Sequence, residues 1–244
     1  MERHYDEHYF FADQYGPKKY TRPDGSVGTF GYHAGGLWGF QRILDKLIEL
    51  LGAPKSVLDI GAGCGGFVAT CNANFIEALG LEFSQYAIDN AVLGAGKYLK
   101  RWDLEETPWP IAHEYDWVTA IDLFEHLFAD KVDDIVAETK RSARRWIIAK
   151  ICTAQLPHEV WNARRGTYEK VYAQAKAEGF EWLVASGHVT CQFPAWWIKK
   201  FVDEDWKLRE DLSERFKRDL SLPEDWRCTL ICENVNWFEK EFGR

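Results

Sequence analysis

The chain has 244 residues, and its 30 Lys and Arg against 38 Asp and Glu give a formal net charge of -8. Its 46% hydrophobic and 28% charged residues are ordinary for a globular protein and exclude extended disorder. The negative charge repels phosphate polymers and anionic lipid, so it disfavours nucleic acids and membrane surfaces as partners.

Export and membrane signals are not recognisable in the sequence. Apolar runs stay well short of the roughly 20 residues that a membrane-spanning helix needs. The first residues lack the basic start and apolar stretch of a signal peptide. We therefore expect a cytoplasmic protein. Its six cysteines form no Cys-x-x-Cys pair and lie mostly in apolar patterns, which predicts reduced core residues rather than disulfides or zinc ligands.

The chain begins with an aromatic, glycine-rich segment and then becomes periodic. Residues 1–36 show no sustained periodicity and are predicted to form an N-terminal arm of loop and short helix. Apolar residues then recur at spacings of three and four over 37–51, which predicts an amphipathic helix that ends at Gly52.

Strands and helices alternate over the next hundred residues. The predicted strands are 56–60, 75–82, 97–102, 115–122 and 146–152. The predicted helices between them begin near 65, 84 and 131. Strands separated by helices of this length form a mostly parallel sheet covered on both faces. The sequence therefore predicts a doubly wound α/β fold.

The alternation is interrupted after Cys152. We expect a single domain over 1–244, in which the core spans 37–152, an insertion spans 153–187 and the C-terminal part of the sheet spans 188–244. Within these parts, helices are predicted at 168–177, 195–202 and 212–220, and strands at 206–211 and 228–233.

The first strand of the core leads into a glycine turn and a helix. Glycines such as Gly61 and Gly63 let the backbone turn sharply and approach a ligand closely. Glu82 ends the second strand, where a carboxylate can accept both hydroxyl hydrogens of a ribose. Both features lie at the carboxyl edge of a parallel sheet, where open α/β folds bind ligands. We expect a nucleoside ligand there.

The same turn also fits the dinucleotide pattern, because Gly61, Gly63 and Gly66 have the spacing G-x-G-x-x-G. An NAD-dependent oxidoreductase is therefore an alternative. A pyrophosphate needs free backbone N–H groups and no fixed negative charge beside it. Asp59, two residues before the first glycine, suits a cationic ammonium or sulfonium better.

The landmarks together resemble the class I S-adenosylmethionine-dependent methyltransferases, in the broad group that acts on small molecules or glycans. The resemblance rests on the segment 58–63, Glu82, Asp103-Leu104 and the segment 116–126, and it covers roughly 37–152. It implies a seven-stranded sheet and S-adenosylmethionine as cofactor. It assigns cofactor contacts to Asp59, Gly61, Ala62, Gly63, Glu82, Phe83, Asp103, Leu104, Asp122 and Leu123. Among these, the glycines would contact the methionine part, Glu82 the ribose and Asp103 the adenine.

Three histidines are candidates for a catalytic base. His126 follows the fourth strand, where the transferred methyl group should lie, and an imidazole can take a proton near neutral pH. His188 and His33 are the competitors. Methyl transfer from a positive sulfur depends mainly on positioning, so a base is needed only when the acceptor arrives protonated.

Segments outside the core should shape the acceptor site. The arm is predicted to fold over the cofactor as a lid, with Tyr5, Tyr9 and Tyr32 near the pocket. Four tryptophans either fill the core beneath the insertion, which we favour, or partly line the acceptor site. These are Trp161, Trp182, Trp196 and Trp197.

Two further patterns are weaker. The segment from His4 to His8 matches a zinc-hydrolase spacing, but it lies at the terminus, so we predict no metal site. Basic clusters such as Arg144-Arg145 and Arg164-Arg165 could bind nucleic acid but are interpreted as solvated helix ends.

The favoured function is methyl transfer to an O or N of a small molecule or glycan. An RNA or DNA methyltransferase and a non-catalytic S-adenosylmethionine-binding subunit stay as alternatives. The oligomeric state is left open.

Overall fold

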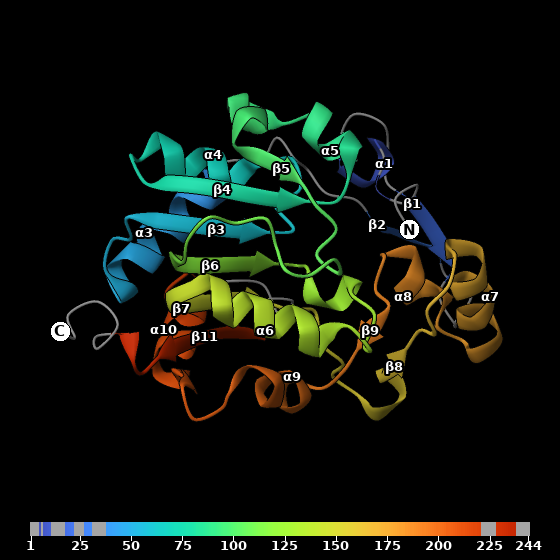
Figure 1. Cartoon of the computed structure of the whole chain (residues 1–244). Coiled ribbons are helices and arrows are strands. Elements are labelled where there is room, and N and C mark those ends of the chain that lie inside the picture. Colours follow the sequence, from blue (N-terminus) through green and yellow to red (C-terminus); the bar gives the residue numbers. More distant parts are fainter. Residues whose placement is uncertain are drawn as a thin grey trace.

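The computed structural model describes residues 5, 7–10, 18–21, 27–30, 38–220 and 228–237. Its centre is a seven-stranded sheet in the order β10-β11-β7-β6-β3-β4-β5 (Figure 1). The strands are β3 Ser56–Ile60, β4 Glu77–Glu82, β5 Leu99–Arg101, β6 Tyr115–Ile121, β7 Ala143–Lys150, β10 Trp206–Leu208 and β11 Thr229–Asn234. Strands β3 to β7 run parallel, and β11 runs antiparallel to both of its neighbours. The predicted doubly wound, mostly parallel sheet is confirmed.

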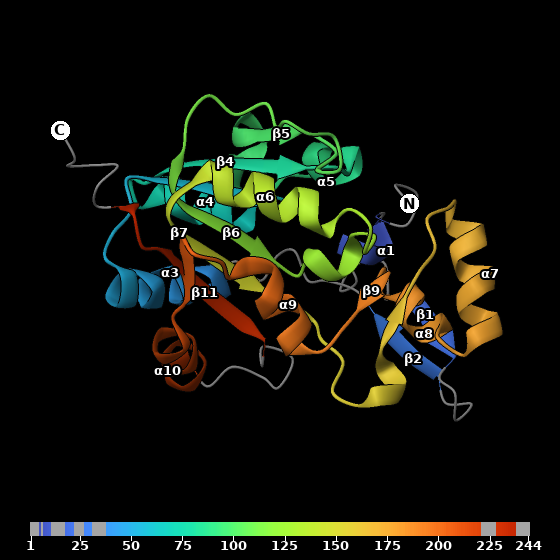
Figure 2. The ribbon, with the colours of Figure 1, turned by 60° about the horizontal axis from the view of Figure 1, so that its bottom comes forward.

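Helices cover both faces of this sheet (Figure 2). One face carries α3 Trp38–Leu51, α4 Gly66–Ala73 and α10 Glu210–Leu220, and the other carries α6 Val132–Ser142 and α9 Pro194–Phe201. Successive side chains of a strand point to opposite faces. Val57 therefore packs in the first of these two cores and Leu58 in the second, and all five residues of β3 are buried.

Several predicted boundaries shift by a few residues. The strand predicted at 75–82 begins at Glu77, because Phe75 has a φ of 61° and is fully exposed. The strand predicted at 146–152 begins at Ala143. The charged start of this strand was not recognised because two of its first three residues, Arg144 and Arg145, are charged. Arg144 does not enter the core but pairs with Asp116 of the neighbouring strand β6.

Between the predicted core and the C-terminal strands lies a small unit with its own apolar cluster. It contains β8 Trp161–Asn162, α7 Tyr168–Glu178, α8 Glu181–Ala185 and β9 Thr190–Cys191. β8 pairs with β9 antiparallel, so this unit continues past residue 187 to Cys191. Its buried cluster includes Trp161, Val171 and Leu183. This packing favours the core interpretation of Trp161.

The described part of the N-terminal arm lies beside that unit. It comprises α1 Glu7–Phe10 and an antiparallel hairpin of β1 Lys18–Thr21 and β2 Val27–Phe30. The hairpin was not predicted, and β1 contacts α8. Figure 1 shows the arrowheads of β3, β4 and β6 pointing toward α1, β1, β2 and α8. The arm and the insertion therefore meet at the carboxyl edge of the sheet.

Short helices complete the chain. They are α5 Gln85–Asp89, η2 Val92–Tyr98, η3 Phe124–His126 and η4 Pro157–Glu159.

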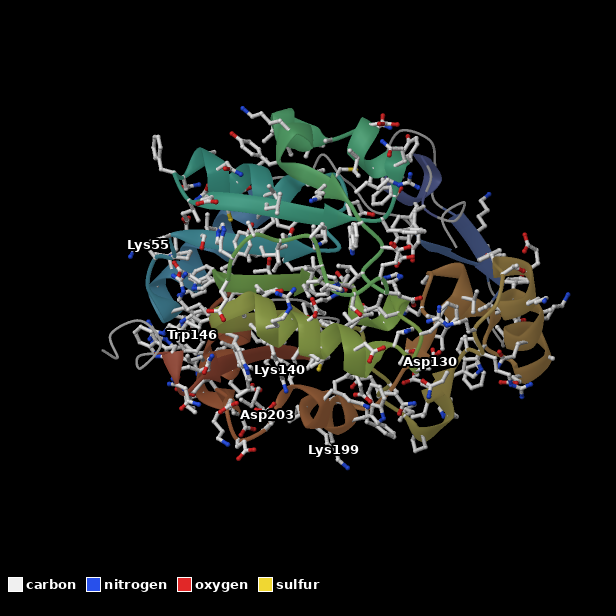
Figure 3. All side chains as sticks on the ribbon, in the orientation of Figure 1. Lys55, Asp130, Lys140, Trp146, Lys199 and Asp203 are labelled. Atoms are coloured by element: carbon white, nitrogen blue, oxygen red, sulfur yellow. The ribbon has the colours of Figure 1, made fainter. Side chains whose placement is uncertain are left out.

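An ion pair joins α6 to the segment that follows α9. It is formed by Lys140 and Asp203, both labelled in Figure 3. Among the residues that the structure describes, no helix has both the length and the apolar character needed to span a membrane.

Candidate functional site

The glycine turn after β3 adopts a backbone that only glycine accepts readily. Gly61, Gly63 and Gly65 have φ values of 70°, 54° and 77°, in the left-handed region that side chains disfavour. A Cβ built on Gly61 would lie 2.7 Å from Leu123 Cδ1. The turn therefore packs directly against the segment that follows β6.

The backbone N–H groups of this turn already have partners in the fold. The N–H groups of Gly61 and Ala62 donate to the Leu81 carbonyl oxygen at 2.9 and 3.1 Å. The Gly63 N–H donates to Glu82 Oε2 at 2.7 Å. A dinucleotide pyrophosphate would need such N–H groups for itself. The turn is thus poorly suited to a pyrophosphate.

Two carboxylates stand beside the turn. Glu82 is 8% exposed at the end of β4, and its Oε1 accepts the Ser84 N–H at 2.7 Å. Each carboxylate oxygen has further acceptor capacity, so Glu82 can still accept hydroxyl hydrogens. Asp59 is buried in β3, where its Oδ1 accepts the Thr119 hydroxyl at 2.6 Å. Burial raises the pKa of Asp59 to about 7, and the nearby charge of Glu82 adds to this increase.

A cavity of about 420 Å³ opens at this edge of the sheet, a size within the usual range of ligand pockets. It brings together the ten predicted cofactor residues, namely Asp59, Gly61, Ala62, Gly63, Glu82, Phe83, Asp103, Leu104, Asp122 and Leu123. Four of these ten residues are acidic, and with Glu105 they give the cavity five carboxylates. The described lining residues include no Lys or Arg. The cavity is therefore suited to a neutral or cationic ligand.

The wall that follows β6 contains a strained residue. Asp122 has a φ of 53°, which is unusual for a residue other than glycine. Its carboxylate forms an ion pair with Lys150, a lysine that is 4% exposed in β7. Backbone strain of this kind is concentrated at functional sites. This pair also anchors the loop that leads to His126.

The three candidate bases have different outcomes. His126, in η3, lines the cavity, and its Nδ1 lies 3.3 Å from the Tyr5 hydroxyl. Burial lowers the pKa of His126 to about 4, so its imidazole is neutral at pH 7. His188 does not line the cavity, although its ring centroid is 5.0 Å from that of His126. His33 lies outside the described residues.

The N-terminal arm contributes one wall of the cavity. Tyr5, Tyr9 and Phe10 line it, and the Ser84 hydroxyl donates to the Tyr5 carbonyl oxygen at 3.2 Å. Burial raises the pKa of the Tyr5 phenol, so it stays protonated and can donate to His126. A lid function of the arm stays a prediction, and Tyr32 lies outside the described residues.

Sequence reasoning missed the apolar residues that complete the cavity. They are Phe40, Cys64, Gly66, Phe67, Ile121, Leu127 and Phe128. Five of the seven lie within three residues of a predicted residue, and Phe67 lies one residue farther, so proximity to the motifs was the available signal. Phe40 has no such neighbour, because it comes from α3.

Three of the four tryptophans considered for an acceptor site lie elsewhere, and the side chain of Trp182 is outside the described part of the structure. Trp197 is fully buried against Phe124, with ring centroids 6.2 Å apart. The Trp161 Nε1–H donates to Glu178 Oε2 at 2.8 Å within the insertion. Trp196 packs on the main core and on Trp197. None of these three lines the cavity.

The basic clusters are paired with acids rather than gathered into one face. Arg141 pairs with Glu138, Arg144 with Asp116, Arg145 with Glu233, and Lys200 with Asp133. In the insertion, Arg165 pairs with Glu105 and Asp130. Pairing reduces the net positive potential available to a phosphate backbone. This arrangement favours the solvated-surface interpretation.

The raised pKa of Asp59 predicts a pH dependence of stability. Between pH 4 and 7 the unfolded chain loses the Asp59 proton while the folded protein keeps it, so the free energy of unfolding falls as pH rises through this window. Asp59→Asn removes this dependence. Between pH 5 and pH 8, the free energy of unfolding of the wild type should decrease by about 2 kcal/mol more than that of Asp59→Asn.

Urea denaturation of the unliganded proteins at both pH values measures this difference. Asp45→Asn, at an exposed position of α3, is the matched control and should follow the wild type. Equal pH dependence in Asp59→Asn and the wild type would contradict the assignment.

Comparison with known proteins gives consistent results. Residues 37–131 match a family model described as a methyltransferase domain. The search of curated proteins gave no match. A SAM-dependent methyltransferase from Archaeoglobus fulgidus has a TM-score of 0.51 at 14% identity, over 82% of this chain and 95% of that one.

Two more solved structures illustrate the range of similarity. The plantazolicin methyltransferase BpumL, in complex with a monoazolic desmethylPZN analog and SAH, has a TM-score of 0.50 at 14% identity, covering 81% of this chain and 82% of that one. DesVI from Streptomyces venezuelae has a TM-score of 0.42 at 15% identity, covering 52% of this chain and 55% of that one. The chain thus spans about half the length of DesVI. The first two of these structures have TM-scores of at least 0.50, and at 14% identity their likeness shows a shared fold. Residues 37–131 therefore match a methyltransferase domain, within a chain whose fold is similar to that of SAM-dependent methyltransferases.

Proposed function

We propose that the protein is an S-adenosylmethionine-dependent methyltransferase that acts on an oxygen or nitrogen of a small molecule or glycan that carries no phosphate. The observation that carries the proposal is the charge of the cavity wall. Five carboxylates line it, and the described lining residues include no Lys or Arg to receive a phosphate. Two of these carboxylates, Asp122 and Glu105, pair with Lys150 and Arg165, which do not line the cavity. The acidic wall still repels an anionic acceptor in a confined site of low dielectric constant.

The cofactor contacts are assigned along the sheet edge in the order of the strands. Glu82 ends β4 and would hold the ribose hydroxyls, while Asp103 follows β5 and would receive the adenine amino group. Leu104 is buried beside Asp103 and supplies an apolar surface for a ring. The turn from Gly61 to Gly63 would contact the methionine part, near the carboxylate of Asp59.

We assign the remaining cofactor contacts to Asp122, Leu123 and Phe83. Asp122 and Leu123 form the wall after β6, and Phe83 follows Glu82 directly. The ion pairs of Asp122 with Lys150 and of Glu105 with Arg165 balance two of the five carboxylates, so the negative potential is concentrated nearer the turn. This position fits a positively charged sulfonium.

The chemistry requires orientation and the exclusion of water. S-adenosylmethionine supplies, when bound, a methyl carbon activated by a positively charged sulfur. The aromatic side chains of Tyr9, Phe10 and Phe128 cover the cavity and can exclude water from it. His126 is the one of the two described candidate histidines that lines the cavity, so we assign it to accept a proton from an acceptor that arrives protonated. His188 stays the second candidate because its ring contacts that of His126.

A cytoplasmic location is part of the proposal. All six cysteines are free, and five of them are buried. Free thiols are typical of reducing compartments, where disulfides seldom persist.

The role of Glu82 can be measured through binding of S-adenosylhomocysteine. Glu82→Ala removes the acceptor for the ribose hydroxyls, and loss of hydrogen bonds to a charged group weakens binding by about 10- to 100-fold. Glu82→Gln, which keeps one acceptor oxygen, should lose less. Isothermal titration calorimetry measures both.

The matched control for this experiment is Glu77→Ala, at the exposed start of the same strand. It should bind S-adenosylhomocysteine like the wild type. A folded Glu82→Ala protein with unchanged affinity would show that Glu82 does not hold the ribose.

The acceptor class is tested by transfer of an isotopically labelled methyl group from S-adenosylmethionine. We expect label in uncharged phenols, sugar hydroxyls or amines, and none in RNA or DNA oligonucleotides. Label in an oligonucleotide would contradict the proposed acceptor. Binding of S-adenosylhomocysteine without transfer to any of these classes would instead favour a non-catalytic binding subunit.

A further inference from the structure

Three side chains able to bind a metal converge behind the wall of the cavity. Glu125 lies in η3, Cys152 follows β7, and His188 follows α8. One ligand atom from each of the three lies within 4.8 Å of the other two. None of the three lines the cavity assigned to the cofactor.

The carboxylate of Glu125 has only part of its hydrogen-bonding capacity satisfied. Glu125 is fully buried, and its Oε1 accepts the Cys152 N–H at 2.9 Å. Its Oε2 is also buried and has no hydrogen-bond partner. An unsatisfied buried carboxylate oxygen carries a large desolvation penalty, so such an atom in a folded protein calls for a ligand.

Protonation of Glu125 does not remove this problem. Burial and the charge of Asp122 raise the pKa of Glu125, which favours the neutral acid. A proton on Oε2 would then itself need an acceptor, and that atom has no partner within hydrogen-bonding distance. A cation satisfies the oxygen without this requirement.

His126, the next residue, connects the three ligand candidates to the cavity. Its ring lines the cavity and is in edge contact with that of His188, at 5.0 Å between centroids. Its imidazole is buried and interacts with the backbone of Gly187, next to His188. The three ligand candidates therefore lie directly behind a residue of the cavity wall.

The ligand types select a metal. One oxygen, one sulfur and one nitrogen form a mixed set that suits zinc, whereas magnesium and calcium prefer oxygen alone. Tetrahedral zinc holds its ligand atoms about 3.4 to 3.8 Å apart at its usual bond lengths. From separations within 4.8 Å, the three atoms would have to approach one another by up to about 1.4 Å, which side-chain rotation can provide.

We propose that Glu125, Cys152 and His188 form a binding site for a divalent cation of the zinc class. The sequence-based expectation was that no metal is bound, and it did not consider these three residues together. They come from three separate segments and have no recognisable spacing. Binding of the cation would release the Cys152 thiol proton and the Glu125 carboxyl proton to solvent, and the resulting thiolate and carboxylate would balance its two positive charges. Its binding does not depend on which acceptor the enzyme methylates.

The test uses the full-length protein after removal of metal with a chelator. Zinc is titrated by calorimetry, and cobalt(II) is titrated by absorbance because a thiolate ligand gives a charge-transfer band in the near ultraviolet. We expect one equivalent of either ion and a charge-transfer band with cobalt. Cys152→Ser should lose the band, and Glu125→Gln should bind zinc at least about tenfold more weakly.

Two controls match these variants. Cys232→Ser replaces another buried cysteine, in β11, and His113→Ala replaces a histidine before β6. Both should keep the band and the zinc affinity of the wild type. Absence of zinc binding in the wild type, or a band that persists in Cys152→Ser, would overturn the proposal. Should Glu125→Gln fail to fold, the cobalt spectra of the wild type and Cys152→Ser decide the outcome.

Discussion

The site depends on how the ends of two neighbouring strands are joined. The Glu82 carboxylate accepts N–H groups from Gly63 and from Ser84, and the Leu81 carbonyl oxygen accepts those of Gly61 and Ala62. Charge-assisted hydrogen bonds to a buried carboxylate are stronger than neutral ones. They fix the glycine turn against the end of β4, and the positive φ angles of the turn follow from that position. Ser84 extends the same arrangement to the arm through the Tyr5 carbonyl oxygen.

This arrangement also determines the electrostatics of the cavity. The Gly63 N–H, which could otherwise receive a phosphate, donates to the Glu82 carboxylate, and the N–H groups of Gly61 and Ala62 donate to the Leu81 carbonyl oxygen. The turn is therefore negative rather than positive. Asp59, one strand away, has its pKa raised by burial and by Glu82. A cationic sulfonium reduces this repulsion when it binds, whereas a pyrophosphate would increase it. The cavity thus has the same sign of charge as the whole protein, whose net charge is -8. Negative charge in both places disfavours acceptors that carry phosphate.

Much of the fold and of the cofactor wall could be predicted because the relevant residues are contiguous. The strand, the glycine turn and Glu82 occupy neighbouring elements of one sheet edge, so spacing along the chain was a good guide to spacing in the structure. The β1–β2 hairpin was missed because its strands are short and lack alternation, although Pro23-Asp24-Gly25 between them is a typical turn sequence. Phe40 and the cluster of Glu125, Cys152 and His188 come from distant segments, and only tertiary packing brings them together. Trp117 and Trp146 lie opposite each other on β6 and β7 and fill the core on the face that carries α3, α4 and α10, rather than the site.

The central claim is that the carboxylate-lined cavity at the carboxyl edge binds a sulfonium nucleoside and excludes a dinucleotide. Calorimetric titration of the wild-type protein with S-adenosylmethionine, S-adenosylhomocysteine and NAD in parallel tests this claim most directly. The account predicts saturable binding of the two adenosyl ligands at one site and no heat of binding with NAD. Binding of NAD without binding of either adenosyl ligand would contradict it.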